Sequence, residues 1–204
     1  MKTTVFVTMI LLLCAGGVAH SAMLLNGSFE DPGLAVDTYS YSVPNGITSW
    51  TAVGGDVYLV NGNGLNATIG PQQGSQWLYM GGGSGGTYVE QTVTGLSVDG
   101  SYNLDGFYGW PGRPGSSAGA FKIVLDGFGD ILPMTYTSSA TWTAFSAPFT
   151  ATAISATIRI HSMNAGGGEQ VAFDNLSIGA VPEPAMVGLL ALGGLALPRR
   201  KKSR

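Results

Sequence analysis

Apolar and polar residues alternate along much of the chain between residues 23 and 180, so that successive side chains fall on opposite sides of an extended backbone. In the segment 120–127, Phe121, Ile123 and Leu125 share one side, while both charged residues of the segment fall on the other. The same alternation occurs in segments 87–96, 153–162 and 169–179. This period is typical of half-buried β-strands and not of helices.

Turn and loop signals separate these segments. Asp-Gly pairs occur at 99–100 and 126–127, and residues 81–86 and 111–119 are rich in glycine or in proline and glycine. At this spacing the body holds roughly nine to eleven short strands, a number typical of an antiparallel sandwich or jelly roll. We therefore predict an all-β fold, an antiparallel β-sandwich, for residues 23–180.

The first 22 residues have the pattern of a secretory signal peptide. Lys2 is followed by an apolar run and then by small residues. The cleavage position stays open, because several small residues occur between 17 and 22. Cys14 is the only cysteine of the 204-residue chain and lies in this segment. We therefore expect a mature protein with no disulfide and no cysteine metal ligand.

Residues 185–197 form an uncharged, largely apolar run, and the basic cluster 199–202 follows it. Thirteen residues of helix are about 20 Å long, which is shorter than the hydrocarbon core of a bilayer, about 30 Å. The run is therefore either a terminal helix packed on the core or a short transmembrane helix. Its glycines and the adjacent basic cluster favour the transmembrane helix.

Charge is distributed unevenly along the chain. Between Met23 and Pro184 there are three basic and twelve acidic residues, a net charge of 3 − 12 = −9, whereas the whole chain has −3. An acidic surface repels phosphate backbones, so we expect no nucleic-acid partner. Carboxylate oxygens are also the ligands that Ca²⁺ prefers.

The C-terminal segment 181–204 resembles the PEP-CTERM protein-sorting signal of Gram-negative bacteria, also called the ice-binding protein C-terminal domain. Pro182, Glu183 and Pro184 match its motif, and the apolar run and basic cluster follow in the same order. The resemblance implies a precursor held transiently in the inner membrane by its C-terminal helix and processed by an exosortase-type membrane protease. The body, residues 23–180, would then reach the cell surface or the extracellular matrix.

The body itself resembles galactose-binding-like jelly-roll domains, which include carbohydrate-binding modules. The stretches "LLNGSFEDP", "GSQWLYMGG" and "AFDNLSI" occur in the order found in that family. In such domains the Glu of the first motif and the Asp of the last often help to bind a structural Ca²⁺. The resemblance thus implies a calcium site at Glu30 and Asp174. The alternative is that these two carboxylates accept backbone N–H bonds in turns.

Aromatic residues supply a second set of candidates, because sugar-binding modules stack sugar rings on exposed aromatic side chains. The body includes Trp50, Trp77, Trp110, Trp142, Tyr39, Tyr41, Tyr58, Tyr79, Tyr88 and Tyr108. Trp50 and Trp142 fall inside strand patterns and are expected in the core. Tyr108, Trp110 and Arg113 lie at the mouth of the 111–119 loop, and we predict them as the ligand-binding residues.

Catalytic patterns are sparse. No G-x-S-x-G elbow occurs, and His161 is the one histidine outside the N-terminal segment 1–22. We therefore expect no enzymatic activity. We predict instead a secreted, carbohydrate-binding β-sandwich with a polysaccharide as its partner. Two alternatives stay open: a surface hydrolase that uses a carboxylate pair, and a purely structural matrix protein without a small ligand.

Overall fold

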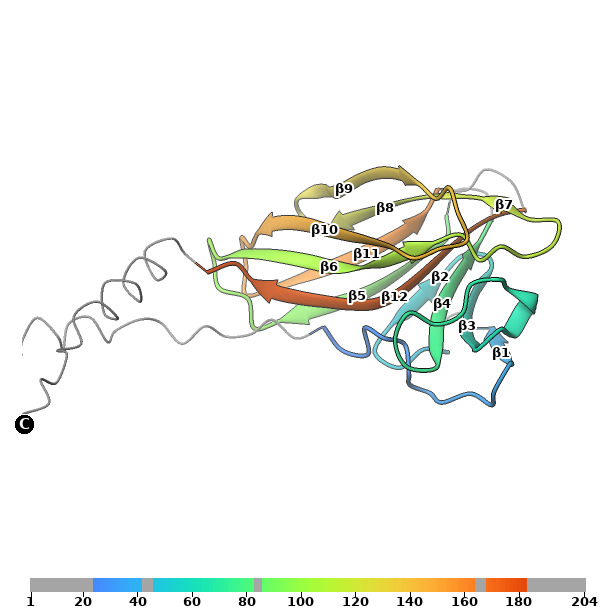
Figure 1. The fold of residues 1–204 in the computed structure, drawn as a ribbon. Helices are drawn as coiled ribbons and strands as arrows, with labels where there is room; N and C mark the ends of the chain where they lie inside the picture. Colours follow the sequence, from blue (N-terminus) through green and yellow to red (C-terminus); the bar gives the residue numbers. More distant parts are fainter. Residues whose placement is uncertain (1–23, 42–45, 83–85, 164–167, 183–204) are drawn as a thin grey trace, which may run out of the picture.

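The computed structural model of the chain describes residues 24–41, 46–82, 86–163 and 168–182. These residues form two β-sheets that pack face to face, one in front of the other in Figure 1. The seven-stranded sheet has the order β1 (Tyr39–Tyr41), β3 (Val57–Asn61), β4 (Gln76–Gly81), β12 (Glu169–Ala180), β6 (Ser101–Gly109) and β10 (Thr143–Thr150), with β7 (Ser117–Ala118) paired to β12. The five-stranded sheet has the order β2 (Thr51–Val53), β5 (Tyr88–Thr94), β11 (Ser155–Ser162), β8 (Ala120–Leu125) and β9 (Gly129–Tyr136).

The pairings of these strands are antiparallel, except that β7 runs parallel to β12. The predicted antiparallel β-sandwich is therefore confirmed. The alternating segments of the sequence become β5, β8, β11 and β12, and their apolar sides meet between the sheets. Leu59, Ile160 and Phe173 are fully buried in this core. Burial of each such side chain stabilises the fold by about 1.5–3 kcal/mol.

A second apolar cluster covers part of the outer face of the seven-stranded sheet. Residues 62–75, which include the 3₁₀ turn η1 (Gly64–Asn66), fold over β4, so that Leu65 and Ile69 join a cluster with Trp77. All six residues of β4 are buried as a result. This cover explains why β4 is apolar on both sides instead of alternating with polar residues.

Trp50 is buried in the main core, as predicted, with its ring centroid 5.6 Å from that of Phe29. Trp142 is half-buried and packs against Trp77 in the second cluster, so it lies outside the space between the sheets. The predicted signal peptide (1–22) and the predicted transmembrane segment (185–197) lie outside the described residues. Within the described ranges, no helix is long and apolar enough to span a bilayer.

Candidate functional site

Four tyrosines form a continuous row on the outer face of the seven-stranded sheet. Tyr41 on β1 lies opposite Tyr58 on β3, and Tyr58 lies opposite Tyr79 on β4. The ring centroids are 5.3 Å apart for Tyr41 and Tyr58, and 5.4 Å apart for Tyr58 and Tyr79. Tyr39, on the same side of β1 as Tyr41, lies 5.7 Å from Tyr58. All three contacts are edge-to-face, an arrangement that aromatic pairs favour.

The row leads from the interior of the protein to its edge. Tyr79 is buried, whereas Tyr39 is 54% and Tyr41 is 53% exposed. β1 is the edge strand of its sheet, and the second apolar cluster, which contains Tyr79, does not include either exposed ring. Two aromatic rings therefore contact Tyr58 while much of their surface remains exposed to solvent.

A pocket of about 430 Å³ lies beside Tyr39. We call it the tyrosine pocket; it is lined by Asp37, Tyr39, residues 63–66 and Arg113. Small-molecule sites usually measure about 300–1,000 Å³, so this pocket suits a ligand of the size of one or two sugar rings. Its lining combines an aromatic ring with a carboxylate, two side-chain amides and a guanidinium. These groups can bond the hydroxyls of a sugar while the ring covers its C–H face.

Arg113 joins the pocket to the buried end of the tyrosine row. Its Nε donates to the carbonyl of Leu65 at 2.9 Å, and its Nη1 donates to the hydroxyl oxygen of Tyr79 at 3.3 Å. Burial raises the pKa of the Tyr79 phenol, although the hydrogen bond from Arg113 lowers it. A guanidinium has five N–H donors. No described residue accepts a bond from Nη2, so donors remain for a ligand in the pocket.

Arg113 differs from the other two basic residues of the described ranges. Lys122 is paired with Asp130 at 3.1 Å, and Arg159 is paired with Glu90 at 2.5 Å. Arg113 is half-buried, and no described carboxylate lies within ion-pair distance of it. Its guanidinium is held instead by hydrogen bonds to the Leu65 carbonyl and the Tyr79 hydroxyl.

One wall of the pocket has an unusual backbone. Leu65 and Asn66 have φ values of 62° and 55°, in the left-handed region that non-glycine residues seldom adopt. Such conformations cost about 1–3 kcal/mol each and persist where neighbouring contacts hold them. Here the bond from Arg113 to Leu65 holds the segment, and a Cβ on Gly64 would lie only 2.4 Å from the carbonyl oxygen of Thr38. Strained backbone conformations of this kind are found most often at active sites and binding sites.

The structure does not bring the three predicted ligand-binding residues to one surface. Arg113 lines the pocket. Tyr108 lies on the inner face of the seven-stranded sheet, with its ring centroid 4.8 Å from that of Phe121. Trp110 is half-buried, and its Nε1 donates to Ser116 Oγ at 3.2 Å. Tyr108 and Arg113 therefore lie on opposite faces of the same sheet.

The aromatic residues of the pocket were among the sequence candidates but could not be selected from the sequence. Tyr39 and Tyr41 have the spacing that places two side chains on one side of a strand, which is the only local signal. Their contacts with Tyr58 depend on the register between β1 and β3. The exposure of Tyr39 and Tyr41 depends on how far the segment 62–75 extends over the outer face of the sheet.

Glu30 and Asp174, the predicted calcium ligands, both bind the loop before β4. Glu30 accepts hydrogen bonds from the backbone N–H groups of Ser75 (2.8 Å) and Gln76 (2.9 Å) and from the Ser75 hydroxyl (2.8 Å). Asp174 accepts bonds from the N–H groups of Gln72 (2.8 Å) and Gln73 (3.0 Å). The structure thus brings the first and last motifs of the body to one loop.

This arrangement is the alternative that the sequence left open, because both carboxylates bind N–H groups. Ca²⁺ takes six to eight oxygen ligands, and within the described ranges no group of three or more His, Cys, Asp or Glu lies together. Carboxylates that face N–H donors do not form a calcium cage as they stand. Burial raises the pKa of Asp174 to about 7, although its backbone bonds lower it, and the charge of Glu30 raises it further. The calcium site stays a prediction.

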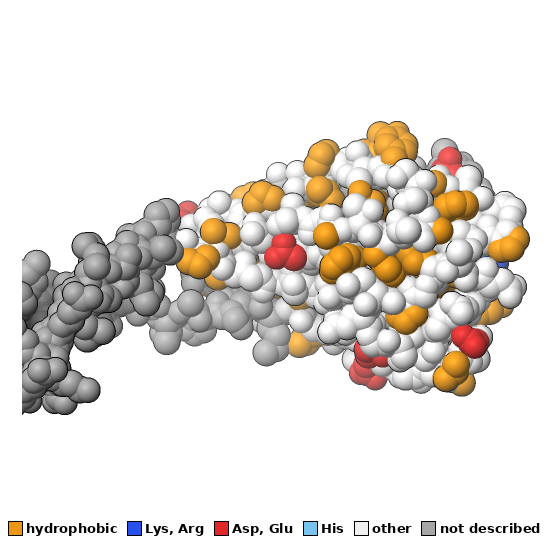
Figure 2. All heavy atoms as spheres, viewed as in Figure 1, with side chains coloured by type: hydrophobic (Ala, Val, Ile, Leu, Met, Phe, Trp, Pro, Cys, Tyr) orange, Lys and Arg blue, Asp and Glu red, His pale blue; other side chains and the backbone are white. Residues whose placement is uncertain are grey.

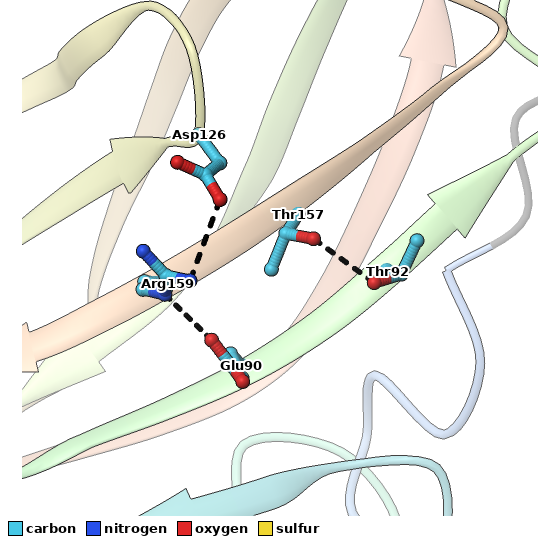
Figure 3. A network of polar contacts seen from close by, with 5 residues as sticks. All are labelled: Glu90, Thr92, Asp126, Thr157 and Arg159. Carbon is cyan, nitrogen blue, oxygen red and sulfur yellow. Dashed lines mark hydrogen bonds and ion pairs between the residues drawn. The ribbon is translucent and has the colours of Figure 1, made fainter.

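The outer face of the five-stranded sheet carries a separate polar network (Figure 3). Arg159 on β11 lies between Glu90 on β5 and Asp126, at 2.5 Å and 3.4 Å. Nearby, the hydroxyls of Thr92 and Thr157 are 2.9 Å apart. Each charged group here has a partner, so the network resembles cross-strand stabilisation more than an empty binding site.

Comparison with known proteins finds relatives in structure only. No family model matches the chain, and no curated protein matches its sequence. The Stig cyclase Fisc from Fischerella sp. TAU is similar, with a TM-score of 0.63, 22% identity and coverage of 81% of this chain and 99% of that chain. The CBM22-1 xylan-binding domain of Xyn10C from Paenibacillus barcinonensis has a TM-score of 0.52, 17% identity and coverage of 74% and 99%. TmCBM61, in complex with β-1,4-galactotriose, has a TM-score of 0.50, 13% identity and coverage of 78% and 99%.

At these identities the comparisons establish the fold and nothing finer. The body has the jelly-roll fold of carbohydrate-binding modules, as its sequence motifs implied. Two of these three structures are carbohydrate-binding modules, and the third is a cyclase. One fold can support both kinds of protein, so function has to be argued from the site.

Proposed function

We propose that this chain is a non-catalytic carbohydrate-binding protein whose ligand site is the tyrosine pocket. The observation that carries the proposal is a pair of exposed tyrosine rings, one of which lines a pocket together with Asp37 and Arg113. An aromatic face beside a few convergent polar groups is the arrangement that a hydroxylated ring with an apolar face requires. The likeness in fold to a xylan-binding domain and to TmCBM61, which was solved with β-1,4-galactotriose, supports the same ligand class.

Binding without catalysis is the simpler use of this pocket. Glycoside hydrolysis generally needs two carboxylates on either side of the scissile bond. Asp37 is the single carboxylate among the lining residues, and it accepts a bond from Asn63 N at 2.9 Å. A surface hydrolase would therefore need a second acid from elsewhere, and release of reducing ends from bound polysaccharide would reveal it.

A glycan array with the full chain tests the proposal. Binding to one class of polysaccharide is expected, and it should weaken at least tenfold in Tyr39→Ala. Tyr136→Ala is a matched control, because this tyrosine is exposed on β9 of the other sheet. A folded protein that binds no glycan would instead favour a structural matrix role. Unchanged binding in Tyr39→Ala would place the site elsewhere.

We further propose export and sorting to the cell surface or extracellular matrix, on the basis of the sequence. The N–H of Val181 donates to the Ser101 carbonyl at 2.8 Å, and the next residue, Pro182, is exposed. The Pro-Glu-Pro motif thus begins where the chain leaves the sheet; Glu183 and Pro184 lie outside the described residues. An exosortase-type protease is the proposed partner. Glu183→Ala should leave the precursor uncleaved, as shown by the mass of the cell-surface form.

A further inference from the structure

We infer that the tyrosine pocket recognises the end of a neutral polysaccharide chain, with the terminal sugar in the pocket beside Tyr39 and the next sugar on Tyr41. This inference rests on the carbohydrate binding proposed above. It goes further because it specifies the charge of the ligand, the part of the chain that is bound and the division of roles between two tyrosines.

The two exposed tyrosines are placed for consecutive sugars. They are two residues apart on β1, which puts them on one side of the strand and about 7 Å apart along it. One sugar unit of an extended chain is shorter than this, so two neighbouring sugars can each reach one of the two rings. Tyr39 lines the pocket, whereas Tyr41 does not. A chain lying across both rings would therefore have one unit inside the pocket and the next outside it.

Asp37, the η1 turn and Arg113 line the pocket together with Tyr39, so protein groups stand beyond this ring. Asp37 Oδ1 accepts a bond from the backbone N–H of Asn63, which joins the segment before β1 to the segment that follows β3. The η1 turn continues this wall, and Arg113 fixes the turn through the Leu65 carbonyl. A polysaccharide that enters over Tyr41 would meet this wall with its first sugar, so chain ends fit and internal segments do not.

The hydroxyl groups of the two tyrosines also differ. Tyr41 Oη donates to the Gly55 carbonyl at 3.3 Å, so it is already engaged. The hydroxyl of Tyr39 makes no hydrogen bond to any residue of the described ranges. Tyr39 can therefore both stack on the terminal sugar and bond one of its hydroxyls, while Tyr41 offers its ring alone.

The charges favour a neutral ligand. The described residues contain three basic and eleven acidic side chains, a net charge of 3 − 11 = −8. Among the described residues, Arg113 is the one cation that lines the pocket, and the carboxylate of Asp37 lines it too. Charged side chains are also sparse on the face of the molecule shown in Figure 2. The net negative charge of the described residues disfavours the approach of a uronic-acid or sulfated chain, whereas a neutral chain pays no such cost.

The test compares intact and fragmented polymers at equal mass. Xylan, β-1,4-galactan, arabinan and mixed-linkage β-glucan are each used whole and after partial acid hydrolysis, and the full chain is titrated calorimetrically. If the protein binds chain ends, the number of binding sites per gram of polymer should rise in proportion to the number of chain ends. A ladder of oligosaccharides from the polymer that binds should gain affinity from one sugar to two and then level off.

Variants separate the two tyrosines. Tyr41→Ala should remove the gain in affinity from one sugar to two. Tyr39→Phe should weaken the binding of every oligosaccharide in the series, whereas Tyr136→Phe, at an exposed tyrosine on β9 of the other sheet, should weaken none. Chain-end recognition would be overturned if the number of binding sites per gram of polymer does not rise with fragmentation. It would also be overturned if the affinity keeps rising beyond four sugars. Either result would leave carbohydrate binding intact. Failure to bind all four polymers would overturn the proposed function itself.

Discussion

The guanidinium of Arg113 lies against the ring of Tyr79, with Cζ 5.6 Å from the ring centroid, and also donates a hydrogen bond to its hydroxyl. Tyr79 belongs to the apolar cluster that covers β4, whereas Arg113 lines the tyrosine pocket. The contact therefore fixes a pocket residue against a buried part of the fold. Cation–π contacts of this kind contribute about 0.5–2 kcal/mol, and here the gain helps to hold a cation that has no carboxylate partner within the described ranges.

Arg113→Lys should weaken glycan binding at least tenfold, because lysine cannot bond the Leu65 carbonyl and the Tyr79 hydroxyl with one planar group. The free energy of unfolding should fall by about 1 kcal/mol through the lost hydrogen bond. Calorimetric titration and urea denaturation measure the two effects. Arg159→Lys is the matched control, since its partners lie on the other sheet. Unchanged binding in Arg113→Lys would contradict the assignment of this residue to the site.

Gly64→Ala should destabilise the wall of the pocket. A Cβ at this position would lie 2.4 Å from the Thr38 carbonyl oxygen, so the η1 turn and the segment before β1 would have to move apart. A loss of about 1–3 kcal/mol in the free energy of unfolding is expected, as for overpacking in a core, together with weaker glycan binding. Gly33→Ala is the control, because nothing lies within 4 Å of its added Cβ. Equal stability of the two variants would show that the close approach does not exist in solution.

Protonation of Asp174 should affect stability between pH 4 and 7. Its pKa is raised from 3.8 to about 7 in the folded protein, chiefly by burial. Between these values the folded state holds more protons than the unfolded state, so the stability that this group contributes is lost as the pH rises. The Asp174→Asn variant lacks this dependence. The difference in unfolding free energy, wild type minus variant, should therefore be more favourable at pH 5 than at pH 8. His161 has a lowered pKa through burial, which acts in the opposite direction, but it is common to both proteins. A difference that does not change with pH would contradict the prediction.

Calcium should be tested by its effect on the melting temperature. If Glu30 and Asp174 turn toward a bound ion, adding Ca²⁺ stabilises the fold, by about 2.7 kcal/mol at a hundred times the Kd. Glu30→Gln should remove that effect, whereas Asp130→Asn on β9 should not. If the carboxylates act only through the N–H groups of residues 72–76, chelator and calcium give the same melting temperature. Glu30→Gln then lowers the stability equally in both, and the calcium prediction is wrong.

The strands and their sides were predictable because alternation is a local property. β5, β8, β11 and β12 occur close to the segments in which apolar and polar residues alternate. β4 was different, because the loop 62–75 buries its second face through a contact between residues that are not consecutive in sequence. For the same reason Trp142 looked like a residue of the main core, although it packs on the outer side of the sheet.

The candidate site was only partly predictable. Arg113 was selected because it follows a Pro/Gly-rich loop, and it does line the pocket. Tyr108 was selected by the same argument, yet it still belongs to β6, where its side chain points to the inner face of the sheet and packs on Phe121. Asp37, Asn63 and Asn66 carry no motif, because they meet only when β1 pairs with β3.

The sequence by itself thus determined the fold class, the acidic surface and the meeting of the first and last motifs of the body. Each of these follows from local periodicity, from composition or from the matched motifs of a known fold. The tertiary structure alone decided which tyrosines are exposed, which cation has no counter-ion and where a pocket forms. These depend on strand register and on the position at which a covering loop ends, and both are set by contacts between residues far apart in the chain.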